Sequence, residues 1–269
     1  MKLSIIATCF AMLVSSYSYA KDTLIFGIVP QQSASKLASQ WIPLMNYLSE
    51  ETGTTIQFAT KPSIPEFEDQ LAKGAYDISY MNPYHYTVFS RDDGYDAIAK
   101  AKNKLIKGIV VVRKDSEIQS MDELAGNKLA FPAPAAFAAS VLSRGYFSQN
   151  DIDITPVYVR SHDSVYLNVA KGLFPAGGGV RRTFKAMDPQ VTEQLRILWE
   201  SKGYTPHAIA VSATMPKALK EKLQQALIKL EQTTPELLDP LKIQGFVAAQ
   251  DSDWDDVREL ALNVDLSTK

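Results

Sequence analysis

The sequence predicts an α/β protein of two wound α/β lobes joined by a two-strand hinge. Apolar segments of strand length alternate with segments of helical periodicity, an order typical of a parallel sheet covered by helices. A strand–helix–strand–helix–strand pattern occurs twice, with right-handed crossovers expected. Strand-like connectors near 105–108 and 204–207 separate the two units. We therefore expect one lobe from residues 21–105 plus 206–269 and a second from residues 106–205, with a cleft between them.

The first unit is predicted from apolar runs and helix-terminal residues. Residues 23–29 form a continuous apolar run, typical of a strand buried on both faces. Gly53 supplies a helix stop, and Ser63 with Glu66 forms a capping box at the start of the next helix. The expected strands are 23–29, 55–60 and 75–81; the expected helices contain 37–48, run from Ser63 to Gly74, and cover 84–91.

The remaining elements follow from the same signals. Ser120 and Glu123 form another capping box before a short helix that ends at Gly126, and Ser161 caps a helix that runs to Gly172. The further expected strands are 97–101, 108–113, 128–131, 155–159, 196–199 and 207–211, and the further helices are 135–146, 216–230, 235–241 and 254–262.

Residues 1–20 have the parts of a secretory signal peptide. Lys2 is positive, residues 3–14 are an apolar run too short to span a membrane stably, and residues 18–20 form a small-x-small cleavage site. Cys9 could instead be a lipoprotein cysteine, but Thr8 beside it and the very short apolar run before it favour the soluble form. We therefore expect an exported protein with a cleavable signal peptide.

Composition excludes several function classes. Cys9 is the only cysteine and leaves with the signal, so the exported chain has no disulfide, thiolate metal site or cysteine nucleophile. The formal net charge is −2, and it becomes more negative once Lys2 is removed. A negative net charge provides no positive electrostatic potential that would attract nucleic acid or an anionic membrane surface.

Residues 74–86 are the stretch most suggestive of a binding site. A short buried strand stops at Asn82-Pro83, because proline has no N–H for a ladder and restricts the residue before it. Aromatic side chains follow directly at 84–86. Ligands of open α/β sheets bind outside the carboxyl ends of the strands, so this strand end is a candidate wall of a cleft. The alternative is a strand-to-helix corner whose aromatic side chains fill a core.

Short motifs in one order along essentially the whole exported chain resemble those of a known family. They are Phe26-Gly27-Ile28-Val29-Pro30, Trp41-x-Pro43-Leu44-x-x-Tyr47-Leu48, Asp77-x-x-Tyr80-x-Asn82-Pro83-x-x-Tyr86, residues 110–116, residues 124–128, Ser161-His162-Asp163 and residues 206–210. Together they resemble the phosphate/phosphite/phosphonate-type substrate-binding proteins of ABC transporters, which have the type 2 periplasmic-binding fold. The resemblance implies a periplasmic location, two lobes that close on a solute, and delivery to a membrane permease.

The sequence differs from this family in the hydrogen-bond donors that hold the ligand. Phosphonate-binding members carry a Ser/Thr-rich turn after the strand that corresponds to 128–131, and its hydroxyl and backbone N–H groups hold the oxyanion. Here residues 132–139 contain no hydroxyl. Losing two hydrogen bonds to a charged group would cost roughly 3–6 kcal/mol, or about two to four decades of affinity. Either the backbone N–H groups of 135–137, or Arg181 and Arg182, replace these donors, or the ligand is not a phosphonate.

The expected ligand contacts combine this resemblance with position in the fold. The family aims a histidine at the oxyanion where this chain has His162; the alternative is a surface histidine in a first helical turn. Tyr80 and Met81 alternate faces, and family position favours Met81. Gly178 either belongs to an anion-binding nest or allows close backbone packing, and Phe137 is either a stacking lid or a core residue. The expected ligand-binding residues are Gln31, Ser63, Met81, Asn82, Tyr84, Ala135, Ala136, Phe137, Ser161, His162 and Gly178.

The glycine triplet 177–179 stands where the family has an acidic residue that meets a ligand amine, which disfavours an aminoalkyl phosphonate. The preferred function is a monomeric binding protein for an ABC importer of a small phosphorus oxyanion. The alternative is a periplasmic ligand sensor for a membrane kinase, with a ligand outside the phosphonate class. A hydrolase is disfavoured, because Ser161, His162 and Asp163 are adjacent and point in different directions. The three histidines show no ligand spacing, so neither a metal nor another cofactor is expected.

Overall fold

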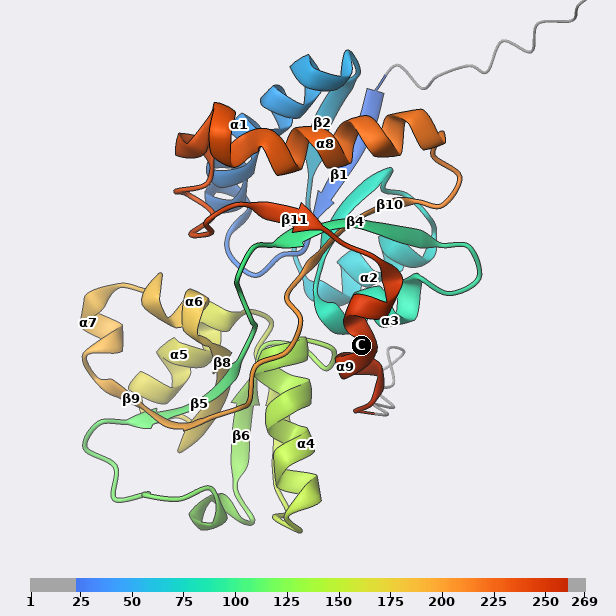
Figure 1. Cartoon of the computed structure of the whole chain (residues 1–269). Coiled ribbons are helices and arrows are strands. Elements are labelled where there is room, and N and C mark those ends of the chain that lie inside the picture. The colour runs from blue at the N-terminus through green and yellow to red at the C-terminus, as the bar shows by residue number, and fades with distance from the viewer. Residues whose placement is uncertain (1–22, 261–269) are drawn as a thin grey trace, which may run out of the picture.

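The computed structural model describes residues 23–260, which form two mixed β-sheets with helices on their faces (Figure 1). The first sheet has the strand order β11-β4-β10-β3-β1-β2 and the second the order β7-β6-β8-β5-β9. The predicted α/β fold with two wound lobes is confirmed. The predicted signal peptide lies outside the described residues. No helix of residues 23–260 combines the length and apolar character needed to span a bilayer.

The first lobe surrounds the six-stranded sheet. Its elements are β1 (Thr23–Ile28), α1 (Ala34–Thr52), β2 (Thr55–Ala59), α2 (Ile64–Ala72), β3 (Ile78–Met81), α3 (Pro83–Phe89), β4 (Tyr95–Ala101), β10 (Ala208–Ser212), α8 (Lys217–Thr233), η3 (Pro235–Leu237), β11 (Phe246–Ala248), η4 (Asp251–Trp254) and α9 (Asp255–Arg258). β1 is parallel to β2 and β3, whereas β10 runs antiparallel to β3 and β4. α1 and α8 lie side by side against the sheet (Figure 1). Their side chains Trp41, Leu44 and Leu227 are buried in the core of this lobe.

The second lobe surrounds the five-stranded sheet. Its elements are β5 (Gly108–Arg113), η1 (Asp122–Leu124), β6 (Lys128–Phe131), η2 (Phe137–Val141), α4 (Leu142–Gln149), β7 (Thr155–Tyr158), α5 (His162–Ala170), β8 (Ala176–Val180), α6 (Arg181–Lys185), α7 (Pro189–Thr192) and β9 (Leu195–Glu200). β6 is parallel to β7 and β8, and β5 is antiparallel to β8 and β9. Each face of this sheet has its own apolar core, one around Phe131 and Phe147 and one around Val165 and Tyr166.

The chain crosses between the lobes from β4 to β5 and again from β9 to β10, as the green and orange segments of Figure 1 show. The two crossing segments pair at one antiparallel bridge, where Ile106 and Tyr204 exchange backbone hydrogen bonds of 2.9 and 3.0 Å. This bridge lies beside the boundaries expected between the two lobes, at residues 105 and 206. The boundaries themselves stay a prediction. A shared apolar core that includes Ile64, Tyr84 and Phe137 fills the space between the lobes.

Close packing explains the glycine at position 178, in the middle of β8. The π-helical turn η2 rests on the second sheet with two carbonyl oxygens turned toward the strands. A Cβ at Gly178 would lie 1.9 Å from the oxygen of Ala139, and one at Gly108 would lie 2.1 Å from the oxygen of Ala138. No side chain fits at these separations. The two glycines therefore allow the first turn of the helix to approach the sheet, which favours the packing explanation of Gly178 over the nest.

The structure corrects several predicted elements. The helix expected at 135–146 begins two residues later, as the π-helical turn η2, and continues as α4 to Gln149. The helix expected at 235–241 is only the 3-10 turn η3, and the one expected at 254–262 is η4 followed by α9, with residues 261–262 outside the described range. The strand β11 was not predicted, because three residues are too short for a periodic signal.

Tyr166 fixes the junction between β8 and α6. Its hydroxyl lies 3.0 Å from the Val180 nitrogen, which donates to it, and 2.7 Å from Thr183 Oγ1. In a Tyr166→Phe variant the buried N–H of Val180 loses its partner, so we expect the free energy of unfolding to fall by about 1–3 kcal/mol in a urea titration. The half-exposed Tyr158 supplies the matched control: Tyr158→Phe should change stability by less than about 0.5 kcal/mol. Equal losses in both variants would contradict this role for Tyr166.

Candidate functional site

An enclosed cavity lies where the carboxyl end of β3 faces the start of the helix formed by η2 and α4. It is lined by Val29, Gln31, Ile64, Asn82, Ile106, Ala136, Phe137, Ala138, Ala139, His162, Val180 and His207. The cavity volume is about 10 Å³, which is room for about one water molecule. The polar side chains of this wall are buried: Asn82 is 3% exposed and His162 is 2% exposed. The lobes are therefore closed around the cavity.

Asn82 forms the wall from the first lobe, because Asn82-Pro83 ends β3 and begins α3. Its Oδ1 accepts a hydrogen bond of 2.8 Å from the His85 nitrogen, which caps the helix. Its Nδ2 donates across the cleft to the carbonyl oxygen of Ala135, at 3.0 Å. Behind it, His85 Nε2 lies 2.8 Å from Glu68 Oε1 in the first lobe's interior. Asn82 is thus held in one orientation and joins the two lobes.

The wall from the second lobe is the first turn of the helix that starts at Phe137. The N–H groups of Phe137, Ala138 and Ala139 belong to this turn, where the helix itself offers them no carbonyl acceptor. All three residues line the cavity. No side chain caps this helix start. The turn therefore presents backbone donors and the positive end of the helix dipole to the cavity.

His162 begins α5 directly after the cap residue Ser161. Its Nδ1 is buried and has no hydrogen-bond partner within residues 23–260. Burial, and secondarily the positive charge of Arg182, lowers the pKa of His162 to about 3. The ring is therefore neutral at pH 7. A neutral imidazole carries one N–H, so His162 can donate one hydrogen bond to an oxyanion in the cavity.

Gln31 and His207 form the side of the cavity nearest the hinge. Gln31 Nε2 donates to His207 Nε2 at 3.0 Å, and Gln31 Oε1 accepts from Arg182 Nη2 of the second lobe. The ring of Tyr80 stacks on His207 with centroids 4.8 Å apart. Burial, followed by nearby positive charges of which Arg182 is the largest, lowers the pKa of His207 well below its usual range.

A second compartment of about 140 Å³ adjoins the cavity on the hinge side. It shares Gln31, Ile106, Val180 and His207 with the cavity, and its other lining residues are Tyr80, Ala101, Lys104, Leu105, Lys107, Arg181, Arg182, Pro206, Leu241 and Ile243. We call it the hinge-side compartment.

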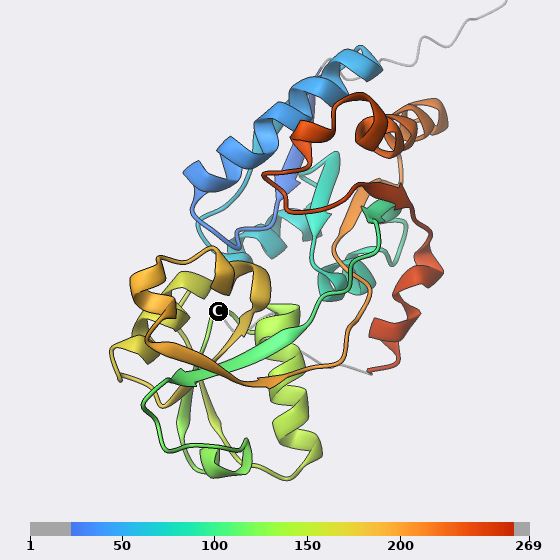
Figure 2. The ribbon, with the colours of Figure 1, turned by 60° about the vertical axis from the view of Figure 1, so that its left-hand side comes forward.

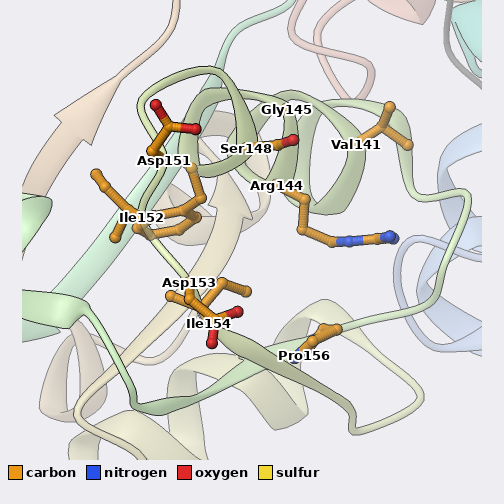
Figure 3. Close-up of a pocket in the computed structure, with 10 residues that line it drawn as sticks. Val141, Arg144, Gly145, Ser148, Asp151, Ile152, Asp153, Ile154 and Pro156 are labelled. Atoms are coloured by element: carbon orange, nitrogen blue, oxygen red, sulfur yellow. The ribbon is translucent and has the colours of Figure 1, made fainter.

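Two further hollows lie away from the cavity. One of about 810 Å³ opens between the start of α2 and the segments 132–134 and 156–160, and includes Ser63. The other, of about 540 Å³, lies beside α4 and the loop 151–156, with Arg144, Asp151 and Asp153 around it (Figure 3). No residue expected to bind ligand lines the hollow of Figure 3. Within residues 23–260, no group of three or more His, Cys, Asp or Glu side chains is placed to hold a metal.

The structure gathers part of the expected ligand set around the cavity. Five expected residues line the cavity: Gln31, Asn82, Ala136, Phe137 and His162. Their contacts with a ligand stay a prediction. The others lie elsewhere: Ser63 caps α2 beside the outer hollow, Met81, Tyr84 and Ala135 pack in the core behind the wall, Ser161 caps α5, and Gly178 lies under η2.

Among the residues that line the cavity with a polar side chain, His207 is the one that sequence reasoning missed. The register pairs Ala208 with Met81, so His207 comes next to the end of β3 on the neighbouring antiparallel strand. The signal was present in the sequence: His207 follows Pro206 at the start of a strand that returns from the second lobe. Without the strand order, however, the sequence does not show that His207 lies beside the end of β3.

Both cavity histidines give a pH-dependent stability. Their pKa values are lowered in the folded state, so the unfolded chain binds more protons below about pH 6.5. Stability should therefore fall as pH falls from about 6.5 to about 5, by up to about 1.4 kcal/mol per pH unit for each histidine. Urea unfolding at several pH values measures this slope, and His162→Gln should remove part of it. An unchanged slope in that variant would contradict the assignment to His162.

Comparison with known proteins adds the evolutionary context. A family model described as "ABC transporter, phosphonate, periplasmic substrate-binding protein" matches residues 26–254. The phosphate-import protein PhnD of Mycolicibacterium smegmatis is 22% identical over an alignment that covers 96% of this chain and 94% of that protein.

Solved structures agree on the fold. A binding component of a phosphonate ABC transporter from Pseudomonas aeruginosa has a TM-score of 0.81 at 18% identity, covering 90% of this chain and 86% of its own. PhnD1 of Prochlorococcus marinus, solved with methylphosphonate, has a TM-score of 0.80 at 16% identity, covering 89% and 97%. A Xanthomonas citri protein solved with ATP has a TM-score of 0.73 at 17% identity, covering 90% and 96%. At these identities the likeness establishes the fold and leaves the ligand open.

Proposed function

This chain belongs to the periplasmic substrate-binding proteins of phosphonate ABC transporters, and on this premise we propose that it captures a small phosphorus oxyanion in the cavity between its lobes. The observation that carries the proposal is the chemistry of the cavity wall. A helix start without a side-chain cap and the buried His162, whose Nδ1 has no partner within residues 23–260, line one cavity. Among the described residues, none of those lining the cavity carries a carboxylate.

Backbone donors replace the hydroxyl-rich turn of the family's phosphonate binders. The N–H groups of Phe137, Ala138 and Ala139 lie at a helix start, which attracts anions through its dipole as well as through hydrogen bonds. His162 adds a side-chain donor from the same lobe. These groups supply four hydrogen bonds at most, each worth about 1.5–3 kcal/mol to a charged oxygen. Four such hydrogen bonds can hold a small oxyanion without the two hydroxyls.

Capture requires the two lobes to open and close. The cavity has room for about one water molecule, so a phosphorus oxyanion can be held there only if the lobes separate about the crossing segments near Ile106 and Tyr204 and then close around it. Hydrogen bonds between the lobes hold the closed form: Asn82 to Ala135, Arg182 to Gln31, and Lys36 Nζ to the Ala186 oxygen at 3.1 Å. The last contact joins the first turn of α1 to the residue after α6. Figure 2 shows the gold helices of the second lobe close to the blue segment between β1 and α1.

The closed form is the state that an ABC permease would recognise, because it presents both lobes in one fixed arrangement. The comparisons name transport proteins and do not favour the alternative of a sensor for a membrane kinase. We propose that the chain reaches the periplasm through the signal peptide at residues 1–20, binds its ligand without catalysis, and acts as a monomer.

A thermal-shift panel tests the proposed ligand class. The purified protein is heated with phosphate, phosphite, methylphosphonate and, as controls, sulfate and acetate. A ligand present at about 100 times its dissociation constant should add about 2.7 kcal/mol of stability. We expect this shift with at least one phosphorus oxyanion. No shift with any of them would reject the ligand class and leave the fold unaffected.

A further inference from the structure

The hinge-side compartment contains more positive charge than the binding of one small oxyanion requires. Its lining includes four cationic side chains, Lys104, Lys107, Arg181 and Arg182, and within the described residues no acidic side chain lines it. It is also larger than the cavity itself, at about 140 Å³ against about 10 Å³.

Two of these cations are paired with one carboxylate. Glu200 Oε1 lies 2.9 Å from Lys107 Nζ, and Glu200 Oε2 accepts from Arg181 Nε. These hydrogen bonds, followed by the two positive charges, lower the pKa of Glu200 against the opposing effect of burial, which is the largest single influence. Lys107 and Arg181 therefore belong to an ion-pair cluster at the rim.

The other two cations hydrogen-bond to neutral oxygens. Arg182 donates one of its five N–H groups to Gln31 Oε1, and Lys104 Nζ donates to the carbonyl oxygen of Lys242 at 2.7 Å. Burial, and then the charge of Arg182, lowers the pKa of Lys104 to about 8. Two partly buried cations close enough to repel each other are stabilised by an anion between them.

The position of this charge matters for a ligand in the cavity. Gln31 and His207 line both spaces, so the hinge-side compartment begins directly behind the hydrogen bond that joins these two side chains. A group attached to the bound oxyanion by a short linker would reach Arg182 and Lys104 on the hinge side. An ammonium group placed between Arg182 and Lys104 would meet like charge.

We propose that the ligand carries two linked anionic groups, a phosphonate or phosphate in the cavity and a second anion, carboxylate or phosphate, held by Arg182 and Lys104 in the hinge-side compartment. This inference rests on the proposed function and narrows its substrate class. Planar arginine suits either oxyanion, because its N–H groups match carboxylate and phosphate geometry. Aminoalkyl phosphonates are correspondingly disfavoured.

Isothermal titration of the purified protein at one ionic strength tests the inference. The probes are methylphosphonate, phosphonoacetate, pyrophosphate and 2-aminoethylphosphonate. We expect phosphonoacetate or pyrophosphate to bind at least about tenfold more tightly than methylphosphonate, and 2-aminoethylphosphonate to bind more weakly. Preference for phosphonoacetate identifies the second group as a carboxylate, and preference for pyrophosphate identifies it as a phosphate. Equal or weaker binding of both two-anion probes would overturn the inference while leaving the proposed function in place.

Variants assign the preference to the two cations. Lys104→Gln and Arg182→Gln should each lower the ratio of two-anion to methylphosphonate affinity by about tenfold, whereas Lys222→Gln on the exposed face of α8 removes the same charge and should leave the ratio unchanged. If the affinity ratio were unchanged in both Lys104→Gln and Arg182→Gln, these two side chains would not hold the second anion. Failure of every phosphorus oxyanion to bind would reject the proposed function itself, and this inference with it.

Discussion

The Gly178→Ala variant should lose about 3 kcal/mol or more of its free energy of unfolding. The added Cβ would lie 1.9 Å from the backbone oxygen of Ala139 and 2.7 Å from the ring of Phe131. Backbone cannot move away as a flexible side chain can, so η2 must lift off the sheet, at a cost at the upper end of that for overpacked cores. The same movement displaces the N–H groups of Phe137–Ala139 from the cavity. Urea unfolding and a ligand titration measure the two effects.

Gly145→Ala is the matched control for this substitution, since Gly145 belongs to the helix that continues from η2. A Cβ at Gly145 meets no atom within 4 Å. Alanine is the better helix former by about 0.5–1 kcal/mol, so this variant should be slightly more stable than the parent protein. If Gly178→Ala were as stable as Gly145→Ala, the close approach of η2 to β8 would be wrong.

The His162→Ala variant should bind its ligand about 10- to 150-fold more weakly than the parent protein. A hydrogen bond to a charged oxygen is worth about 1.5–3 kcal/mol, and the buried Nδ1 of His162 has no partner within residues 23–260 that competes for it. The loss should appear with every phosphorus oxyanion that binds. Titration calorimetry at pH 7, where His162 is neutral, measures it directly.

Ser161→Ala separates ligand contact from helix capping. The Ser161 hydroxyl accepts from the Ser164 nitrogen at 3.1 Å and donates to Ser164 Oγ at 2.9 Å, so both of its roles are local. Removing it should destabilise the protein by about 1 kcal/mol and change affinity by less than about threefold. If Ser161→Ala weakened binding as much as His162→Ala, the hydroxyl would be a ligand contact after all.

The sequence predicts the wound architecture well, because local signals specify it. Gly53 adopts a left-handed φ of 70° at the end of α1, and Ser63 caps α2 from the position that the capping box indicates. The parallel strands β1 and β6 are apolar runs buried in the sheets. Elements without such signals were missed or misplaced, as the three-residue β11 and the π-helical turn at Phe137 illustrate.

The candidate site is predicted less completely, because its contacts join distant parts of the chain. Gln31 and Arg182 are 151 residues apart, and Gln31 and His207 are 176 apart. No periodicity or motif reports such pairs. Asn82 could be identified because it caps a helix directly after a strand, and His162 because it matches a histidine of the family that the sequence resembles. The sequence offers Arg182 only as one possible replacement for the missing hydroxyl donors, and only the packing of α6 against the loop after β1 places it beside Gln31.

The measurement that tests the account most directly is a crystal structure of the protein with the phosphorus oxyanion that binds best. We predict the phosphorus atom in the cavity, with its oxygens within hydrogen-bond distance of His162 and of the N–H groups of Phe137–Ala139. A ligand bound instead in the hollow of Figure 3, between α4 and the loop 151–156, or in the outer hollow beside Ser63, would contradict it.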